Sequence, residues 1–207
     1  MPMIDGDMQS YPLTLDKFLR HAAKWHPRGE VVTAREGGRI DRIGYAALMA
    51  RSLKVSAVLA GLGLVRGGRV ATLAWNTQAH VEAWYAIMGM GAVCHTLNPR
   101  LTAAELATMA GQSEAHILIA SADLAPLARE IMTGAPRIEC LLLIDADEDP
   151  ASLERLLAEA EGDIAWGEFE ETAPSGLCFT SGTTGAPKGV TFTHRSMVFM
   201  SSVNLPK

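Results

Sequence analysis

The chain has 207 residues, of which 48% are hydrophobic and 20% are charged. Such a composition is typical of one globular domain, or a large part of one, and it excludes a disordered chain. The 18 Lys and Arg residues are outnumbered by 23 Asp and Glu residues, so the formal net charge is -5. This charge offers no basic surface for nucleic acid or for an anionic membrane, and we expect neither as a partner.

Cysteine usage and the N-terminal residues indicate the cellular compartment. Cys94, Cys140 and Cys178 lie far apart in apolar surroundings without CxxC spacing, which predicts neither a disulfide framework nor a zinc site. The first twelve residues lack the apolar core of a signal peptide, and the apolar stretch 81–97 is interrupted by polar residues and glycines. We therefore expect a cytoplasmic protein without a transmembrane segment.

The N-terminal part of the chain predicts a helix, a hairpin and a second helix. The first helix begins after Thr14, a plausible N-cap, and ends before Pro27 and Gly29. Its apolar positions follow helical spacing, at Leu15, Phe18, Leu19, Ala22 and Trp25. Two strand-like runs at 31–35 and 39–43 flank a glycine pair and predict a hairpin, and a helix over about 45–59 follows.

From residue 69 onward, apolar runs alternate with helical patterns. Strands are expected at 69–75, 92–97, 116–120 and 139–144, separated by helices from 76 or 77 to 88, from 102 to about 111, and at 123–132 and 150–161. Thr102 and Glu105 match a capping box, in which each side chain accepts from the other residue's backbone. This alternation predicts an α/β fold with mostly parallel strands, flanking helices and right-handed crossovers.

Several polar and aromatic residues are interpreted as structural. The acidic turn 145–149 is expected to be a solvated connection, which we favour over a divalent metal site. Cys178 is expected to be a small buried core residue and not a nucleophile. His95 is expected to be a strand histidine with satisfied hydrogen bonds, and the core aromatics are expected to include Trp75, Trp84 and Tyr85.

The stretch 178–189, CFTSGTTGAPKG, combines four hydroxyl residues, three glycines, a proline and one lysine. Glycine backbone N–H groups, hydroxyl donors and a lysine charge suit a polyphosphate better than a neutral ligand. The stretch differs from a Walker A loop, because Pro187 replaces its second glycine and Gly189 replaces its Ser or Thr. The β-branched and aromatic residues that follow predict a strand, so the loop is expected to join strands 177–179 and 190–193 as a hairpin.

The sequence TSGTTGAPK, residues 180–188, resembles the phosphate loop of the adenylate-forming, or AMP-binding, superfamily. That superfamily includes acyl-CoA synthetases, aryl-CoA ligases, luciferases and the adenylation domains of peptide synthetases. The stretch 89–106 is similar to a strand and loop of the same superfamily, and 13–27 and 73–93 look most like medium- and long-chain fatty-acyl-CoA synthetases. The resemblance covers about residues 13–196, and it implies the N-terminal part of the large domain of such an enzyme.

The resemblance also implies a reaction and a set of binding residues. A fatty acid would be activated by ATP to an acyl-adenylate and then transferred to coenzyme A. Lys188 and the backbone of the glycine loop would hold the β- and γ-phosphates, and Thr180 would meet Mg²⁺. The loop residues implied in nucleotide binding are Ser181, Gly182, Thr183, Thr184 and Gly185. No catalytic residue is assigned, and His194 and Arg195 are interpreted as polar residues at a helix start.

The resemblance divides the chain into an α/β subdomain at 1–174, the phosphate-loop hairpin at 175–193 and the start of a further segment at 194–207. Complete members of the superfamily continue beyond this point, so we expect an N-terminal fragment without the C-terminal domain. Such a fragment is expected to be inactive alone and to self-associate, for example as a homodimer, through uncovered surfaces. Two alternatives remain: an aryl-CoA ligase or peptide-synthetase adenylation fragment, and a non-catalytic nucleotide-binding or oligomerisation module.

Overall fold

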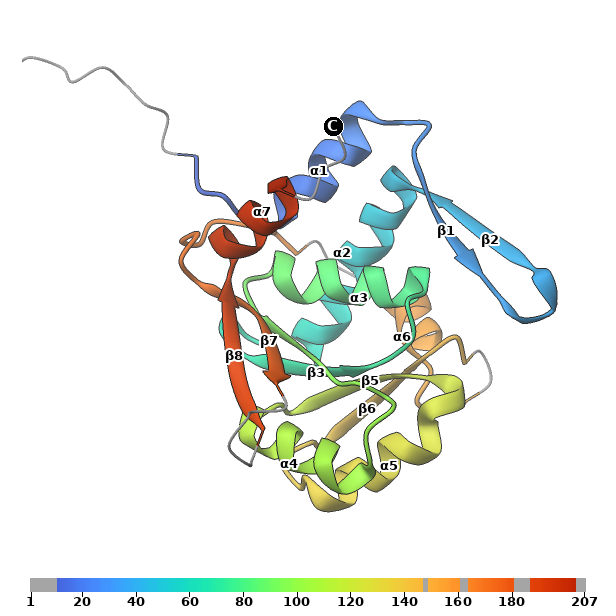
Figure 1. Cartoon of the computed structure of the whole chain (residues 1–207). Coiled ribbons are helices and arrows are strands. Elements are labelled where there is room, and N and C mark those ends of the chain that lie inside the picture. The colour runs from blue at the N-terminus through green and yellow to red at the C-terminus, as the bar shows by residue number, and fades with distance from the viewer. Residues whose placement is uncertain (1–10, 147–148, 161–163, 181–186, 204–207) are drawn as a thin grey trace, which may run out of the picture.

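A six-stranded sheet forms the centre of the protein. The computed structural model describes residues 11–146, 149–160, 164–180 and 187–203. The strand order is β6–β5–β3–β4–β7–β8, in which the first five strands are parallel and β8 is antiparallel to β7 (Figure 1). The strands are β3 (Arg69–Leu73), β4 (Val93–Thr96), β5 (Ile117–Ser121), β6 (Cys140–Ile144), β7 (Pro174–Thr180) and β8 (Lys188–Thr193). The predicted α/β fold with a mostly parallel sheet is therefore confirmed.

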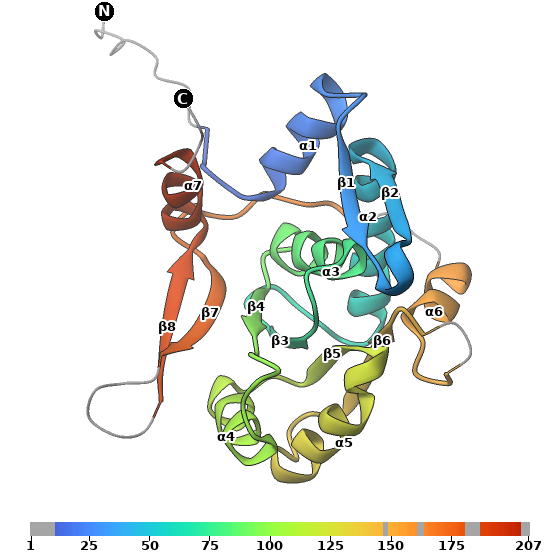
Figure 2. The same ribbon diagram turned by 45° about the vertical axis from the view of Figure 1, so that its right-hand side comes forward.

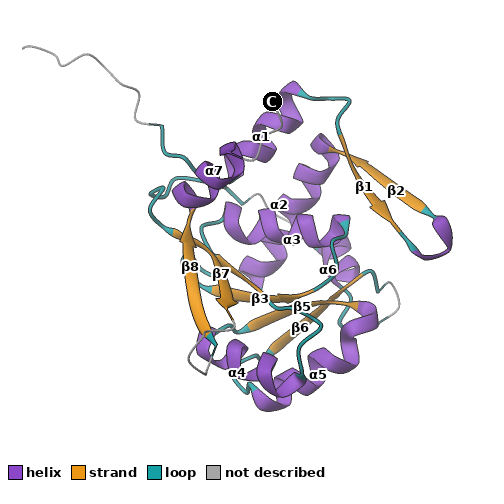
Figure 3. Cartoon of the chain, viewed as in Figure 1, coloured by secondary structure: helices purple, strands orange, loops and turns teal. Residues whose placement is uncertain are grey.

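Helices cover both faces of the parallel strands (Figure 3). One face carries α2 (Tyr45–Gly61), α3 (Gln78–Gly89) and α6 (Leu153–Glu159), and the other carries α4 (Ala103–Ser113) and α5 (Ala125–Gly134), which follows a short 3-10 turn, η2 (Ala122–Leu124). Neighbouring residues on β3 face opposite layers, so Val70 packs with the first group of helices and Ala71 with the second. Burial on both faces explains why β5 reads as a continuous apolar run.

The N-terminal elements lie against the α2–α3 layer. Helix α1 (Asp16–Trp25) crosses this layer, and strands β1 (Glu30–Ala34) and β2 (Ile40–Gly44) form an antiparallel hairpin around η1 (Glu36–Gly38), as Figure 2 shows. Gly37 and Gly38 have φ angles of 70° and 79°, a left-handed conformation that favours glycine and that explains the glycine pair. The predicted hairpin is confirmed. The last described helix is α7 (His194–Val203), which directly follows β8.

The helix caps agree only partly with the sequence. The capping box is present, with Thr102 N donating to Glu105 Oε2 at 2.9 Å and Glu105 N donating to Thr102 Oγ1 at 3.4 Å. Thr14 is not the N-cap of α1, because the helix begins one residue later with Leu15 in that position. At α3, the side chain of Thr77 in the N-cap position makes no capping hydrogen bond. Instead, Gln78 N donates at 2.9 Å to Thr33 Oγ1 of β1, so the β1–β2 hairpin caps this helix.

The aromatic residues expected in the core are more exposed than predicted. Trp75 is 42% exposed and Trp84 is 36% exposed, whereas Tyr85 is half-buried. Trp84 lines a groove of about 1160 Å³, and Phe18 and Trp25 of α1 line the same groove. The prediction was wrong for both tryptophans. Trp75 follows the end of β3 and lines a surface pocket, and helical spacing does not show which side of α3 meets the sheet.

Trp166 anchors the connector before β7 to the helical layer. It is 4% exposed, and its Nε1 donates to Ser56 Oγ of α2 at 2.8 Å. The indole ring lies directly on Gly89 at the end of α3, where an added Cβ would stand 2.4 Å from Trp166 Cδ2. Only a glycine at this position allows the ring to pack so closely.

No helix in the described ranges is long and apolar enough to cross a membrane.

Substitution of Gly89 tests this contact. Gly89→Ala forces Trp166 out of position, and we expect the free energy of unfolding to fall by about 1–3 kcal/mol, as for other overpacked cores. Gly111→Ala is the matched control, because Gly111 lies in α4 with nothing within 4 Å of the added Cβ. The control should be neutral or stabilising, since alanine favours a helix. Equal urea midpoints for the two variants would contradict the proposed packing.

Candidate functional site

The β7–β8 hairpin carries the candidate site. Thr180 and Lys188 are directly opposed in its register, and Thr180 Oγ1 donates to the Lys188 carbonyl oxygen at 3.4 Å. Both residues are exposed. A strand and not a helix follows the lysine, so the predicted hairpin is confirmed and a Walker A geometry is excluded. The other predicted loop residues, Ser181, Gly182, Thr183, Thr184 and Gly185, lie outside the described residues.

Pairing with β4 places this hairpin at the carboxyl edge of the sheet. β7 runs parallel to β4 through the pairs Cys94–Gly176 and His95–Leu177. The end of β7 therefore lies on the same edge as the ends of β3 and β4, and Figure 2 shows the hairpin beside β4. Ligands of open α/β sheets bind outside the carboxyl ends of the strands. The position of Thr180 and Lys188 thus agrees with a ligand-binding role.

A polar pocket of about 360 Å³ lies at the carboxyl ends of β3 and β4. His80 forms its wall: Nδ1 donates to the Trp75 carbonyl oxygen at 3.2 Å, which leaves Nε2 to accept from Thr72 Oγ1 at 3.0 Å. Burial lowers the pKa of His80, so the ring is neutral and fixed in one tautomer. The residues lining the pocket include Trp84, Asn98 and Arg100. The sequence analysis missed this pocket, although its residues directly follow two predicted strands.

His95 differs from the expectation of a satisfied strand histidine. The side chain is fully buried, and neither ring nitrogen has a hydrogen-bond partner among the described residues. Its ring packs at a tilt against Phe179 of β7, with 5.1 Å between the ring centroids. Burial lowers the pKa of His95 to about 4, so the ring remains neutral and acts as an apolar surface between β4 and β7.

Cys178 is exposed, which corrects the expectation of a buried core residue. Side chains alternate along β7, so Leu177 turns inward with 8% exposure while Cys178 lies on the opposite face. The Cys178 sulfur lies 3.6 Å from Thr96 Oγ1 at the end of β4. The apolar sequence around the cysteine does not reveal this exposure, because β7 lies close to the edge of the sheet.

The acidic turn after β6 connects two parts of the fold. Asp145 accepts from Arg35 Nη2 at 2.8 Å and from Thr77 Oγ1 at 3.4 Å, which ties the β1–β2 hairpin to the end of β6. The hydrogen bond to Asp145 raises the pKa of Arg35. Within the described part of the chain, no group of three or more His, Cys, Asp or Glu side chains has a metal-binding arrangement.

Comparison with known proteins identifies the family. A model of the AMP-binding enzyme family matches residues 19–206. The chain belongs to the AMP-binding enzyme family. This result agrees with the resemblance of residues 180–188 to the phosphate loop of adenylate-forming enzymes.

The relatives of this AMP-binding protein include several acid–CoA ligases. It is 35% identical to a 3-methylmercaptopropionyl-CoA ligase of Ruegeria lacuscaerulensis, over 95% of this chain and 38% of the relative. It is 33% identical to a medium-chain-fatty-acid–CoA ligase of Ectopseudomonas oleovorans, over 95% of this chain and 37% of the relative. A long-chain-fatty-acid–CoA ligase of Thermus thermophilus is 36% identical, with 97% and 37% covered. The chain thus spans 37–38% of the length of these relatives.

Solved structures show the same fold. A long-chain-fatty-acid-CoA ligase, FadD1, of Archaeoglobus fulgidus matches with a TM-score of 0.80 at 20% identity, over 95% of this chain and 40% of that chain. The inhibitor-bound N-terminal domain of FACL13 from Mycobacterium tuberculosis matches with a TM-score of 0.76 at 29% identity, over 87% and 44%. The fold is therefore that of the N-terminal part of the large domain in adenylate-forming enzymes.

The buried His95 makes stability depend on pH. Between pH 6.5 and 4 the unfolded chain binds a proton at His95 and the folded chain does not, so acid favours unfolding. His95→Leu removes this contribution. We expect urea unfolding to show that the loss of unfolding free energy between pH 7 and pH 4.5 is smaller in this variant by about 2.5 kcal/mol.

His116→Gln provides the control, because His116 is exposed. This variant should lose as much stability on acidification as the unchanged protein. If His95→Leu also shows the unchanged pH dependence, His95 is protonated in the folded state and its described surroundings are incorrect.

Proposed function

We propose that this chain supplies the polyphosphate-binding hairpin of an ATP-dependent acid–CoA ligase whose acid substrate is a fatty acid. The observation that carries the proposal is the opposed pair Thr180 and Lys188 at the carboxyl edge of the sheet. Membership of the AMP-binding enzyme family supports a nucleotide at this edge. The names of two relatives, a medium-chain and a long-chain fatty-acid–CoA ligase, support the acid substrate.

The proposed reaction has two steps. In the first, a carboxylate oxygen of the fatty acid attacks the α-phosphorus of ATP, and the bond to the β-phosphate oxygen breaks to release pyrophosphate. In the second, the thiol of coenzyme A attacks the acyl carbonyl carbon, loses its proton and displaces AMP. Both steps are proposals for a protein of the relatives' length, because this chain covers only 37–38% of them.

Lys188 would stabilise the negative charge that grows on pyrophosphate as it leaves. The lysine is exposed and has no ion-pair partner among the described residues, so its ammonium group is available to a ligand. Pro187 directly precedes it and limits the backbone freedom of the approach to β8. The hydroxyl and backbone donors of 181–185 would complete the cradle for the β- and γ-phosphates.

Mg²⁺ would be held with the nucleotide by Thr180. Its hydroxyl is exposed, and its described hydrogen bond to the Lys188 carbonyl oxygen is long at 3.4 Å, so the oxygen remains available as a ligand. A single protein hydroxyl fits an ion that keeps several waters and binds mainly through substrate phosphates, as Mg²⁺ does. When bound, the ion would neutralise phosphate charge.

Removal of the lysine charge tests the proposed phosphate contact. Lys188→Ala should weaken binding of MgATP to this chain by about tenfold or more, the usual effect of losing one charge-assisted hydrogen bond. Isothermal titration calorimetry measures the affinity directly. Lys188→Arg keeps the charge and should retain more of the affinity than alanine does.

Lys54→Ala is the matched control, since Lys54 is an exposed lysine on α2 far along the chain from the hairpin. It should bind MgATP as the unchanged chain does. Equal MgATP affinities for Lys188→Ala and the unchanged chain would contradict the proposed role of the hairpin.

A further inference from the structure

Polar contacts connect the N-terminal segment to the β7–β8 hairpin at the end opposite Thr180 and Lys188. The junction lies where the segment before α1 meets the start of α7 (Figure 1). Glu171, in the connector before β7, joins both sides: its Oε2 accepts from Leu13 N at 2.7 Å, and its Oε1 pairs with Arg195 Nη1 at 3.1 Å. The backbone adds a bond of 2.8 Å from Arg195 N to the Glu171 carbonyl oxygen. Three segments distant in sequence therefore meet directly beyond β8.

His194 lies at the centre of this junction and is fully buried, although it is the first residue of α7. Its Nδ1 accepts a hydrogen bond of 3.3 Å from Leu15 N. A neutral imidazole carries one hydrogen, so a ring that accepts through Nδ1 must carry its hydrogen on Nε2. Nε2 is buried without a hydrogen-bond partner among the described residues. His194 therefore presents a buried donor that needs an acceptor.

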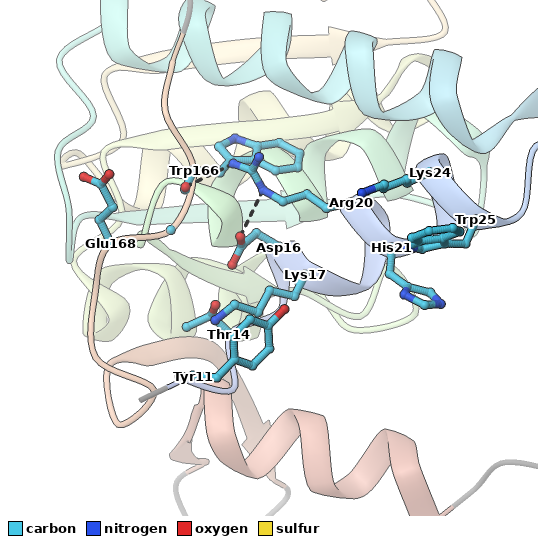
Figure 4. A pocket seen from close by; sticks show the side chains of 11 residues that line it. Tyr11, Thr14, Asp16, Lys17, Arg20, His21, Lys24, Trp25, Trp166 and Glu168 are labelled. Atoms are coloured by element: carbon cyan, nitrogen blue, oxygen red, sulfur yellow. Dashed lines mark hydrogen bonds and ion pairs between the residues drawn. The ribbon is translucent and has the colours of Figure 1, made fainter. Parts of the chain in front are cut away.

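Asp16 presents the complementary group from the first turn of α1. The residue is 3% exposed, and its Oδ2 accepts from Arg20 Nε at 3.2 Å. Figure 4 shows this oxygen turned toward Arg20 and the other carboxylate oxygen turned away from it. That second oxygen, Oδ1, is buried and has no hydrogen-bond partner among the described residues. Asp16 thus presents a buried acceptor that needs a donor.

The two groups are neighbours, because Leu15, whose N–H donates to His194 Nδ1, directly precedes Asp16. Burial lowers the pKa of His194 to about 4, and the negative charge of Asp16 opposes this shift. A buried polar atom without a partner destabilises the folded chain, and the described contacts supply no partner for either atom. One buried water would satisfy both atoms, because it can accept from Nε2–H and donate to Oδ1.

We propose that one buried water accepts from His194 Nε2–H and donates to Asp16 Oδ1, and that this water-mediated bond positions the phosphate-binding hairpin. His194 is then a positioning residue that acts through β8. This positioning role rests on the proposed function, whereas the bond itself does not. β8 extends from Lys188 to Thr193, so the bond fastens one end of the strand whose other end carries the lysine. This additional attachment helps to hold the hairpin in place, because β7 is paired with β4 at only two register positions.

The tautomer of His194 can be measured in the unchanged chain, so this test does not depend on a variant that folds. Nitrogen-15 NMR should show a neutral His194 ring at pH 7 with its hydrogen on Nε2, and that hydrogen should exchange slowly with water. A hydrogen on Nδ1, or exchange as fast as in a free imidazole, would overturn the proposal.

A double-mutant cycle tests the bond itself. His194→Asn keeps an acceptor near the position of Nδ1 for Leu15 N but lacks the Nε2 donor, and Asp16→Ala removes the acceptor. We expect the two substitutions to be coupled by about tenfold in the unfolding equilibrium constant. Asp41→Ala with His194→Asn is the control pair, since Asp41 lies on the β1–β2 hairpin, and its effects should multiply without coupling. Coupling below about twofold for Asp16 and His194 would overturn the bond.

MgATP affinity tests the positioning role. His194→Asn should bind MgATP about three- to tenfold more weakly than the unchanged chain at a temperature where both are folded. His194→Gln keeps a donor near Nε2 and should restore part of this affinity. Unchanged affinity in His194→Asn, when Lys188→Ala binds weakly, overturns the positioning role and leaves the proposed function intact. A third outcome is coupling between Asp16 and His194 in the double-mutant cycle while Lys188→Ala binds MgATP normally. This outcome supports the bond and contradicts the proposed function.

Discussion

The short parallel pairing between β4 and β7 is the contact on which the candidate site depends. It consists of the pairs Cys94–Gly176 and His95–Leu177. Because the strands are parallel, it brings the end of β7 to the edge where the other parallel strands also end. Without this pairing, Thr180 and Lys188 would stand on an isolated hairpin. The ring of His95 packed on Phe179 adds apolar contact at the same place.

The connector before β7 holds the hairpin from the opposite side. Trp166 fixes its beginning to α2 through the Ser56 hydrogen bond, and Glu171 links its end to the N-terminal segment and to Arg195. These contacts come from parts of the chain that are far apart in sequence, so they form only when the whole fold is assembled. The strand pair that carries the glycine-rich sequence 181–186 is thus fixed at both ends by packing and polar contacts.

Local sequence predicted features that arise within a few residues. The capping box at Thr102 and the strand after Lys188 follow from neighbouring residues and were confirmed. Features that arise between distant segments were not predictable: Thr33 caps α3 from another element, and Cys178 is exposed because β7 lies near the sheet edge. The pocket around His80 was missed for the same reason, since it exists only where the ends of β3 and β4 adjoin. Thr180 and Lys188 could both be named as candidate binding residues because one continuous motif contains both, whereas their opposed register comes from the structure.

The central claim is that the tip of the β7–β8 hairpin holds a nucleotide polyphosphate, and an NMR titration with MgATP tests it most directly. Backbone amide signals of the chain would be followed as MgATP is added. We predict the largest shifts at Thr180 and from Lys188 to Gly189, with smaller changes at β4 and none on the exposed face of α1. Shifts confined to α1 or to the β1–β2 hairpin, with the signals of Thr180 and Lys188 unchanged, would contradict the account.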